Sequence, residues 1–404
     1  MTAGSRADVL DEEAVLAHLA TPEFNDDPTA VYRFFLAHPG WYSPSGYRVF
    51  ARYDDVRTIL RTADVFGQPG RKDGNFHTAD PPEHTRLRKL VTHAFTFRAI
   101  KQQRDFISEV ATELLDDIRP VGRMDLATDF GALLPGRVTA KLLGVDYQDG
   151  ARWQSWLEAI KASRGVVHYL APDPAEIERI DAAAAAAAAG TADYLAGLIR
   201  ERRAGTGSDI ISVLLSAKEG DDTLTEKELL YTLLLLLGAG LHTTSAQIAT
   251  TMALLFAHPD VLERVRADPA LVPAAVEEAL RFDGALQAEY RVVRVATQIG
   301  GVELQPGEKV LIVVGAANRD AAKFADPDVF DLDRPNAKDH LTFGSGIHRC
   351  LGAELSRAEL EIAVTQLLTT LPDLHAAGAA VRHHYNRWRG LASMPVAWSV
   401  RDGS

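Results

Sequence analysis

One segment constrains this 404-residue chain more than any other: residues 343–352 read FGSGIHRCLG and contain the only cysteine, Cys350. Glycines at 344, 346 and 352 allow the backbone to turn tightly and to approach a flat ligand closely. From Leu351 onward, apolar residues recur at helical spacing between charged ones, so a helix is expected to begin at the sulfur. The dipole and the free N–H groups of such a helix terminus favour a thiolate.

A single sulfur restricts the kinds of site that the chain can build. Zinc and iron–sulfur sites need several protein ligands, whereas one thiolate is enough to hold a haem iron. The alternative is that Cys350 is an inert, buried, small apolar residue, which is the commoner role of a lone cysteine. The glycine-rich loop and the helix start beside it favour the ligand.

This segment resembles the haem-binding signature of the cytochrome P450 family, Phe-Gly-x-Gly-x-His-x-Cys-x-Gly. The fixed positions of the signature are matched by Phe343, Gly344, Gly346, His348, Cys350 and Gly352. The resemblance extends over about residues 25–400. It implies a mainly α fold with a minor β region, and a b-type haem buried between a long central helix and the loop and helix of the cysteine. It also implies that the Cys350 thiolate is the axial ligand of the iron.

Composition agrees with one large globular domain over residues 1–404. The chain is 47% apolar and 24% charged, and no linker rich in Pro, Gly or Ser divides it. Disorder is expected only toward the ends, in about residues 1–20. The N-terminal residues lack the basic and apolar regions of a signal peptide, and the longest apolar run, 229–241, is too short to span a membrane. A lone cysteine fits a reducing cytoplasm, and a net charge of −12 argues against general binding to nucleic acid or anionic membranes.

A helix is expected to start near Asp80, with Asp80 as its N-cap, Pro81 in the first position and Glu83 in the third. This helix carries His84 and Arg88 four residues apart, and therefore on one face. Such a face is most often a solvated basic surface. The family resemblance instead implies that both side chains bind a haem propionate, and that Arg291 is a further propionate ligand.

A second long helix is predicted from the capping box at residues 225–228 to about residue 255. Glycines and threonines in its middle, residues 238–244, indicate a local bulge or kink, or merely close helix packing. By resemblance this helix crosses the oxygen-binding face of the haem, with Ala239, Gly240 and Thr243 in the family's pattern. At position 242 the family usually has Asp or Glu paired with the threonine for proton supply, whereas this chain has His242. An imidazole can also relay protons, or the usual relay is lost.

Three further residues match the family's buried structural network: Glu278 and Arg281 of the Glu-x-x-Arg motif, and Arg334 from a later meander. Asp283 and Gly284 stand where the family often has prolines. The substrate pocket is expected to be lined by Leu237, Ala239 and Leu286, and the turn near Met394, between two paired terminal strands, is expected to touch substrate.

These features predict a haem-thiolate monooxygenase that oxygenates a small, largely apolar organic substrate with O₂ and two electrons, as in hydroxylation or epoxidation. Because no flavin or reductase segment is present, the resemblance implies a separate ferredoxin and ferredoxin reductase as electron donors. A basic docking patch is expected at Arg86, Lys89, Arg98, Lys101, Arg349 and Arg357. His242 keeps open a haem-thiolate enzyme of other chemistry, such as a peroxygenase, an oxidative coupling enzyme or an N-oxidising enzyme. A non-enzymatic haem sensor is the remaining alternative.

Overall fold

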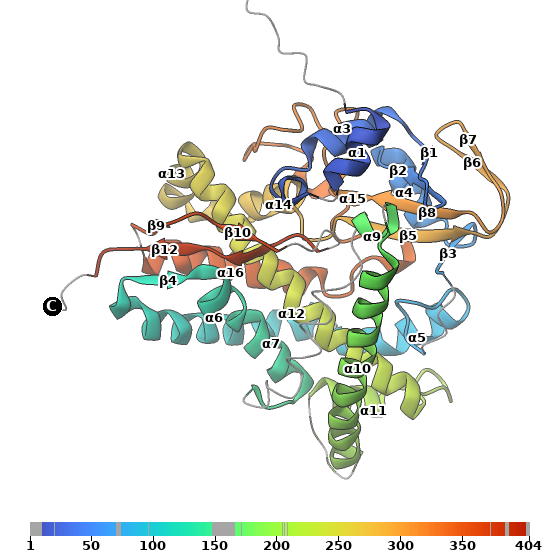
Figure 1. Cartoon of the computed structure of the whole chain (residues 1–404). Coiled ribbons are helices and arrows are strands. Elements are labelled where there is room, and N and C mark those ends of the chain that lie inside the picture. The colour runs from blue at the N-terminus through green and yellow to red at the C-terminus, as the bar shows by residue number, and fades with distance from the viewer. Residues whose placement is uncertain are drawn as a thin grey trace, which may run out of the picture.

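A computed structural model describes residues 10–19, 21–69, 74–95, 97–147, 166–170, 172–203, 205, 207, 209–371, 373–383 and 388–400. The side chains of residues 22, 97–102 and 167 lie outside this description. Helices dominate the fold, and the strands form smaller regions, with the five-stranded sheet on one side and β4, β9 and β12 on the other (Figure 1). The mainly α fold with a minor β region is therefore confirmed.

The helices occupy most of the chain. Their bounds are α1 Glu12–Leu19, α2 Pro22–Asp26, α3 Thr29–Ala37, α4 Tyr53–Arg61, α5 Glu83–Thr92, α6 Phe97–Ile118, α7 Leu133–Leu143, α9 Val166–Leu170, α10 Pro174–Arg203, α11 Ile210–Ser216, α12 Glu226–Ala257, α13 Pro259–Ala267, α14 Val272–Phe282, α15 Val314–Ala317 and α16 Ala353–Thr370. A π-helical turn, Leu126–Gly131, precedes α7.

The largest sheet has the strand order β1-β2-β8-β5-β3, in which β2 and β8 are parallel and the other neighbours are antiparallel. The strand bounds are β1 Trp41–Tyr42, β2 Tyr47–Phe50, β3 Phe66–Gly67, β4 Arg123–Asp125, β5 Ala288–Val293, β6 Thr297–Ile299, β7 Val302–Leu304, β8 Lys309–Val313, β9 His375–Ala376, β10 Val381–Arg382, β11 Leu391–Ser393 and β12 Pro395–Ala397. The sheet places β5, and with it Arg291, beside the region that the long helix crosses.

Helix α12 runs through the middle of the molecule (Figure 1). It starts with the predicted capping box, in which the Thr225 hydroxyl accepts from the Glu228 N–H and the Glu228 carboxylate accepts from the Thr225 N–H. Its apolar residues pack against α7, α14 and α16 in the largest hydrophobic core. The helix continues without a break from Glu226 to Ala257, so residues 238–244, for which a local bulge or kink or merely close packing was expected, remain α-helical.

Two helices, α10 and α12, are long and apolar enough by composition to cross a membrane. More than half of the apolar window of α12 is buried within the protein, as expected of a core helix. The corresponding window of α10 is mostly exposed, although its strongly helix-forming alanines account for much of its hydropathy.

Three local predictions need correction. Helix α5 starts at Glu83 rather than at a cap on Asp80, because the Asp80 carboxylate instead accepts from the Gln68 N–H and pairs with Arg294. The two terminal strands do not pair with each other: β11 pairs with β10, and β12 lies between β4 and β9. Residues 12–19, inside the range where disorder was expected, form α1 because Val15 and Leu19 are buried.

Candidate active site

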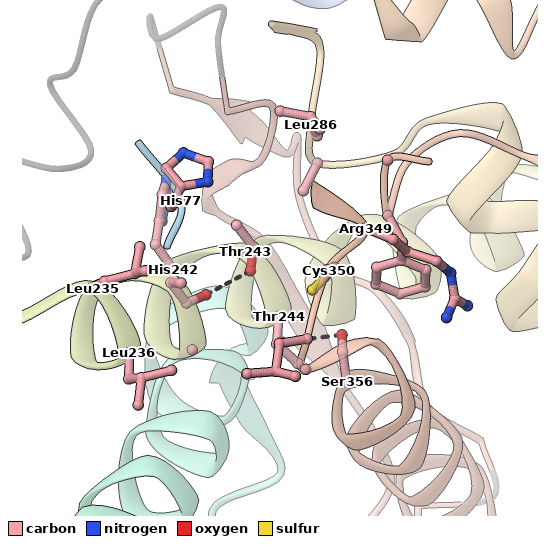
Figure 2. A pocket seen from close by; sticks show the side chains of 18 of the residues that line it. His77, Leu235, Leu236, His242, Thr243, Thr244, Leu286, Arg349, Cys350 and Ser356 are labelled. Carbon is pink, nitrogen blue, oxygen red and sulfur yellow. Dashed lines mark hydrogen bonds between the residues drawn. The ribbon is translucent and has the colours of Figure 1, made fainter. Parts of the chain in front are cut away.

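A cavity of about 520 Å³ lies between α12 and the segment that carries Cys350. This volume is in the range of cofactor and small-molecule sites. The predicted site residues of the cysteine segment that line this cavity are Phe343, Gly344, His348, Cys350 and Gly352. Those from α12 are Ala239, Gly240, His242 and Thr243. Figure 2 shows the Cys350 sulfur together with Thr243 at this cavity.

The loop that presents Cys350 is held by its own backbone. The Cys350 N–H donates to the Phe343 carbonyl at 2.8 Å, and Gly344 and Gly346 both have positive φ, which glycine adopts without strain. At Gly346 a Cβ would also meet the Leu60 carbonyl oxygen of α4 at 2.5 Å, so packing against α4 requires a glycine here as well. Helix α16 begins three residues after the sulfur, with Gly352 as its N-cap.

The sulfur of Cys350 is deep inside the protein, although it is accessible from the cavity. Burial raises the pKa of the Cys350 thiol, while the Gly352 backbone N–H and three cations, Arg88, Arg349 and Arg357, act in the opposite direction. A metal ion that replaces the thiol proton would remove the cost of burying an unpaired thiolate. In the described part of the chain, no group of three or more His, Cys, Asp or Glu residues is placed to hold a metal ion, so a multi-ligand site with Cys350 is not formed there.

Basic side chains meet at one end of the cavity. Arg88, Arg291 and His348 line it, and the His84 ring lies behind them, 4.4 Å from the His348 ring between centroids. The ring nitrogens of both histidines are buried and make no hydrogen bond of good geometry. Burial and then Arg88 lower the pKa of His84, and burial, Arg291 and His84 lower the pKa of His348 to about 3.

A haem fits this arrangement. Its two propionates would supply the carboxylates that the basic cluster lacks, since the only described carboxylate against Arg291 is that of Glu289, at 3.5 Å. They would also accept from the unsatisfied imidazoles of His84 and His348. The apolar cavity beyond the cluster would receive the macrocycle, with Cys350 placed to be the single axial ligand.

On α12 the Thr243 hydroxyl donates to the Ala239 carbonyl at 2.9 Å, and Thr244 donates to Ser356 of α16 at 3.1 Å (Figure 2). His242 is 5% exposed, and its ring centroid lies 6.0 Å from that of His383. Gly240 allows close packing, because a Cβ there would meet the Thr139 hydroxyl of α7 at 2.9 Å. The family's small residue at this position therefore has a packing role here as well.

Two predicted pocket residues lie elsewhere. Leu237 faces the core beside α10 and α11 rather than the cavity, and the neighbouring α12 residues Leu234, Leu235 and Leu236 line the cavity instead. Met394 is 3% exposed and packs in the main core. Leu286 does line the cavity. Leu237 misses the cavity because its position on the helical turn of α12 directs it toward the core. Met394 misses it because β12, which follows directly, pairs with β4.

Behind the cavity, Glu278 joins two arginines. Its carboxylate accepts two hydrogen bonds from Arg281, each of 2.7 Å, and one of 3.0 Å from Arg334. The side chains of Glu278 and Arg281 are both completely buried. The remaining guanidinium hydrogens go to carbonyls of the meander, those of Asn318, Pro327 and Val329 among them. This network fixes the meander that leads into the Cys350 loop.

Sequence reasoning did not foresee the roles of several polar groups near the cavity. Asp283, at the end of α14, is bound by Arg382 and Arg389, which hold its pKa well below the usual range although burial acts against this. Glu359 of α16 lines the cavity, and burial raises its pKa to about 8. His77 lines the cavity from the segment before α5. No motif marks these residues, and only the fold brings them to the site.

Comparisons with known proteins agree with this geometry. The chain matches the sequence model of the family described as cytochrome P450 over residues 49–372. It is 34% identical to cytochrome P450 107B1 of Saccharopolyspora erythraea, with 98% of this chain and 99% of that protein covered. It is 38% identical to the nocardicin C N-oxygenase of Nocardia uniformis, with 86% and 88% covered.

Among solved structures, CYP109E1 from Bacillus megaterium in complex with testosterone is similar, with a TM-score of 0.88, 30% identity and 94% and 100% of the two chains covered. This family uses haem with a cysteine thiolate as axial ligand, and the cysteine loop and the basic cluster described above suit that group. The chain is therefore a member of the cytochrome P450 family of haem-thiolate monooxygenases.

Proposed function

We propose that this P450 inserts one atom of O₂ into a small, largely apolar organic substrate, by hydroxylation, epoxidation or a related oxygenation. The observation that supports this most is the composition of the cavity wall. This wall consists mainly of apolar side chains, including Phe76, Leu142, Leu143, Leu234, Leu235 and Leu286. Apolar walls with a few polar groups are typical of sites for apolar ligands.

Each residue of the site has a proposed role. Cys350 holds the iron, and His84, Arg88, Arg291 and His348 bind the propionates. A thiolate-bound haem supplies the oxygen-activating chemistry. Ala239 and Gly240 leave room beside α12. Thr243 donates its own proton to Ala239, so its oxygen stays able to accept a hydrogen bond from the cavity.

His242 is proposed to replace the family's acid as a proton relay beside Thr243. It lines the cavity, and it contacts His383, whose side chain is partly exposed to solvent. An imidazole titrates near neutral pH, which suits a relay group. The proposed path leads from solvent through His383 to His242.

A second candidate is a haem-thiolate enzyme of other chemistry, such as a peroxygenase, a coupling enzyme or an N-oxidising enzyme. The observation that favours it is the absence of an acid at position 242. One relative is named an N-oxygenase, so such chemistry occurs among similar proteins.

Electrons are proposed to come from a ferredoxin and its reductase, in the cytoplasm. The basic patch is weaker than its sequence indicated, because several members are already paired: Arg86 with Asp222 and Glu228, Lys89 with Glu219, and Arg357 with Glu277 and Glu354. Arg349 is half exposed, with Glu354 at 3.8 Å. The side chains of Arg98 and Lys101 lie outside the described residues. Arg349 is thus the main docking cation that we propose.

A ligand screen tests the proposed substrate class. Compounds are titrated into the haem-loaded ferric protein, and a shift of the Soret band reports displacement of water from the iron. Apolar compounds should shift the band, and polar analogues of equal size should shift it less. A protein that responded only to the charged or polar members of each matched pair would contradict the proposal.

A further inference from the structure

A compact ionic network lies beside the Cys350 loop. Arg357 of α16 donates from Nε to Glu277 Oε1 at 2.5 Å and from Nη2 to Glu277 Oε2 at 3.3 Å. Its Cζ lies 4.7 Å from the centroid of the Phe343 ring. The backbone carbonyl of Phe343 accepts a hydrogen bond from the N–H of Cys350, the proposed iron ligand. Arg357 therefore contacts the side chain of the residue that anchors the Cys350 backbone.

Glu277 also lies close to a second group beside this ring. His340 Nε2 lies 3.3 Å from Glu277 Oε2, and the His340 ring centroid is 5.5 Å from that of Phe343. Two groups near the Phe343 ring, Arg357 and His340, therefore both lie against the Glu277 carboxylate. Because Glu277 is on α14 and Arg357 is on α16, the carboxylate ties two helices to the cysteine loop.

The pair is ionised and poorly solvated. The Glu277 side chain is 6% exposed and that of Arg357 is 17% exposed. Burial alone would raise the pKa of Glu277, but the interactions with His340 and Arg357 outweigh it, and the pKa falls to about 2. Glu277 likewise raises the pKa of Arg357 despite burial. Neither charge changes over the pH range in which the protein would work.

Arg357 acts electrostatically on the Cys350 sulfur, as do Arg88 and Arg349. The charge of Arg357 is balanced by Glu277 in a region with little water, where charges are weakly screened. Glu354 also accepts from Arg357, at 2.8 Å, but its side chain is 56% exposed. Water screens Glu354, so its charge counts for much less at the sulfur.

We propose that Glu277 is a positioning residue for the haem ligand: by holding Arg357 on the Phe343 ring and balancing its charge, Glu277 sets the reduction potential of the thiolate-bound iron. The inference rests on the proposed role of Cys350 as the iron ligand. The reaction concerned is the gain of one electron by ferric iron from the donor protein, which gives ferrous iron, and no proton moves at Glu277. An unbalanced cation near the sulfur would favour the more negative, reduced state.

Spectroelectrochemical titration of the haem-loaded protein tests this inference. Glu277→Gln keeps the shape and an oxygen acceptor but removes the charge. We expect it to shift the one-electron equilibrium toward ferrous iron by about tenfold, which corresponds to about 59 mV for a one-electron couple. Arg357→Gln leaves Glu277 unbalanced and should shift the potential in the opposite direction. The double variant should return close to the parent value.

Glu354→Gln is the matched control, because it removes a carboxylate from the same guanidinium at an exposed position, and it should leave the potential nearly unchanged. Opposite shifts in the two single variants that cancel in the double variant would establish the inference. Equal potentials in all variants, even with reduced thermal stability, would show that the pair is only structural. A shift in Glu277→Gln that persists in the double variant would also overturn it.

The carbon monoxide spectrum of each variant separates this inference from the assignment of the ligand. If the thiolate-type band is present and the potentials do not move, only the role of Glu277 fails. If the band is absent in the parent protein, the ligand assignment itself fails.

Discussion

The His242 ring of α12 lies against the His383 ring, with centroids 6.0 Å apart and ring planes at 73°. One residue faces the cavity, and the other is partly exposed to solvent. The two imidazole rings therefore lie in sequence between solvent and the cavity, and imidazoles can carry protons near neutral pH.

If His242 relays protons, His242→Ala should lower the product formed per electron consumed and raise hydrogen peroxide release, with haem content unchanged. His242→Asp should restore part of the coupling, because a carboxylate can also relay protons. Peroxide and product are measured against consumption of the reduced electron donor. An alanine variant with altered substrate affinity and an unchanged peroxide yield would instead assign His242 to packing or substrate contact.

Glu278 should be among the most important residues for stability. Glu278→Gln removes the charge that balances two buried guanidinium groups, those of Arg281 and Arg334, and should cost about 3–5 kcal/mol of unfolding free energy. Urea unfolding of the haem-loaded protein, followed by fluorescence and by the Soret band, measures this loss.

Asp333→Asn provides the control for Glu278, since it breaks an exposed, two-pronged pair with Arg264. We expect this variant to unfold at nearly the parent urea concentration. Equal losses in the two variants would mean that burial does not decide the strength of these networks.

Particular residues show which parts of the structure could be predicted from the sequence. The signature from Phe343 to Gly352 and the capping box at Thr225 are local patterns, so their loop and helix start could be predicted. The Asp80 cap was wrong because a distant arginine, Arg294, binds that carboxylate. Contacts between distant segments leave no local pattern.

The same reason applies to the cavity. Leu237 and its neighbour Leu236 are alike in sequence, and only the rotation of α12 against its packing partners decides which of them faces the cavity. Asp283 meets Arg389 from more than 100 positions away, and Glu277 meets Arg357 from 80 positions away. Family resemblance supplied the shared motif residues, but not the networks around them.

Glu359 should make stability depend on pH. Its carboxyl is fully buried, and burial raises its pKa from 4.5 in the unfolded chain to about 8. The folded state therefore binds a proton that the unfolded state releases, so the folded protein loses stability as the pH rises from about 4.5 to 8.

Glu359→Gln removes this dependence. The variant should match the parent below pH 4.5 and become the more stable of the two as the pH rises, by roughly 3–5 kcal/mol above pH 8. Differential scanning calorimetry from pH 5 to 9 measures the difference. Parallel stability profiles for variant and parent would show that the Glu359 carboxyl is not buried as a neutral acid.

Arg349 should matter for reduction by an acidic donor. Charge reversal in Arg349→Glu should slow reduction by a ferredoxin, and added salt should slow the parent more than the variant. Stopped-flow reduction at several ionic strengths measures both effects. Arg33→Glu, on α3, reverses another half-exposed arginine and serves as the control. Rates that do not depend on salt or on Arg349 would rule out electrostatic docking at this surface.

The carbon monoxide difference spectrum of the reduced protein tests the central claim most directly, because the position of its main band reports the iron ligand. With Cys350 as the only thiol in the chain, the parent protein should absorb at the position diagnostic of thiolate ligation. Cys350→Ser should lose that band. A variant that retained it, or a haem-loaded parent protein that lacked it, would contradict the assignment of Cys350 as the haem ligand.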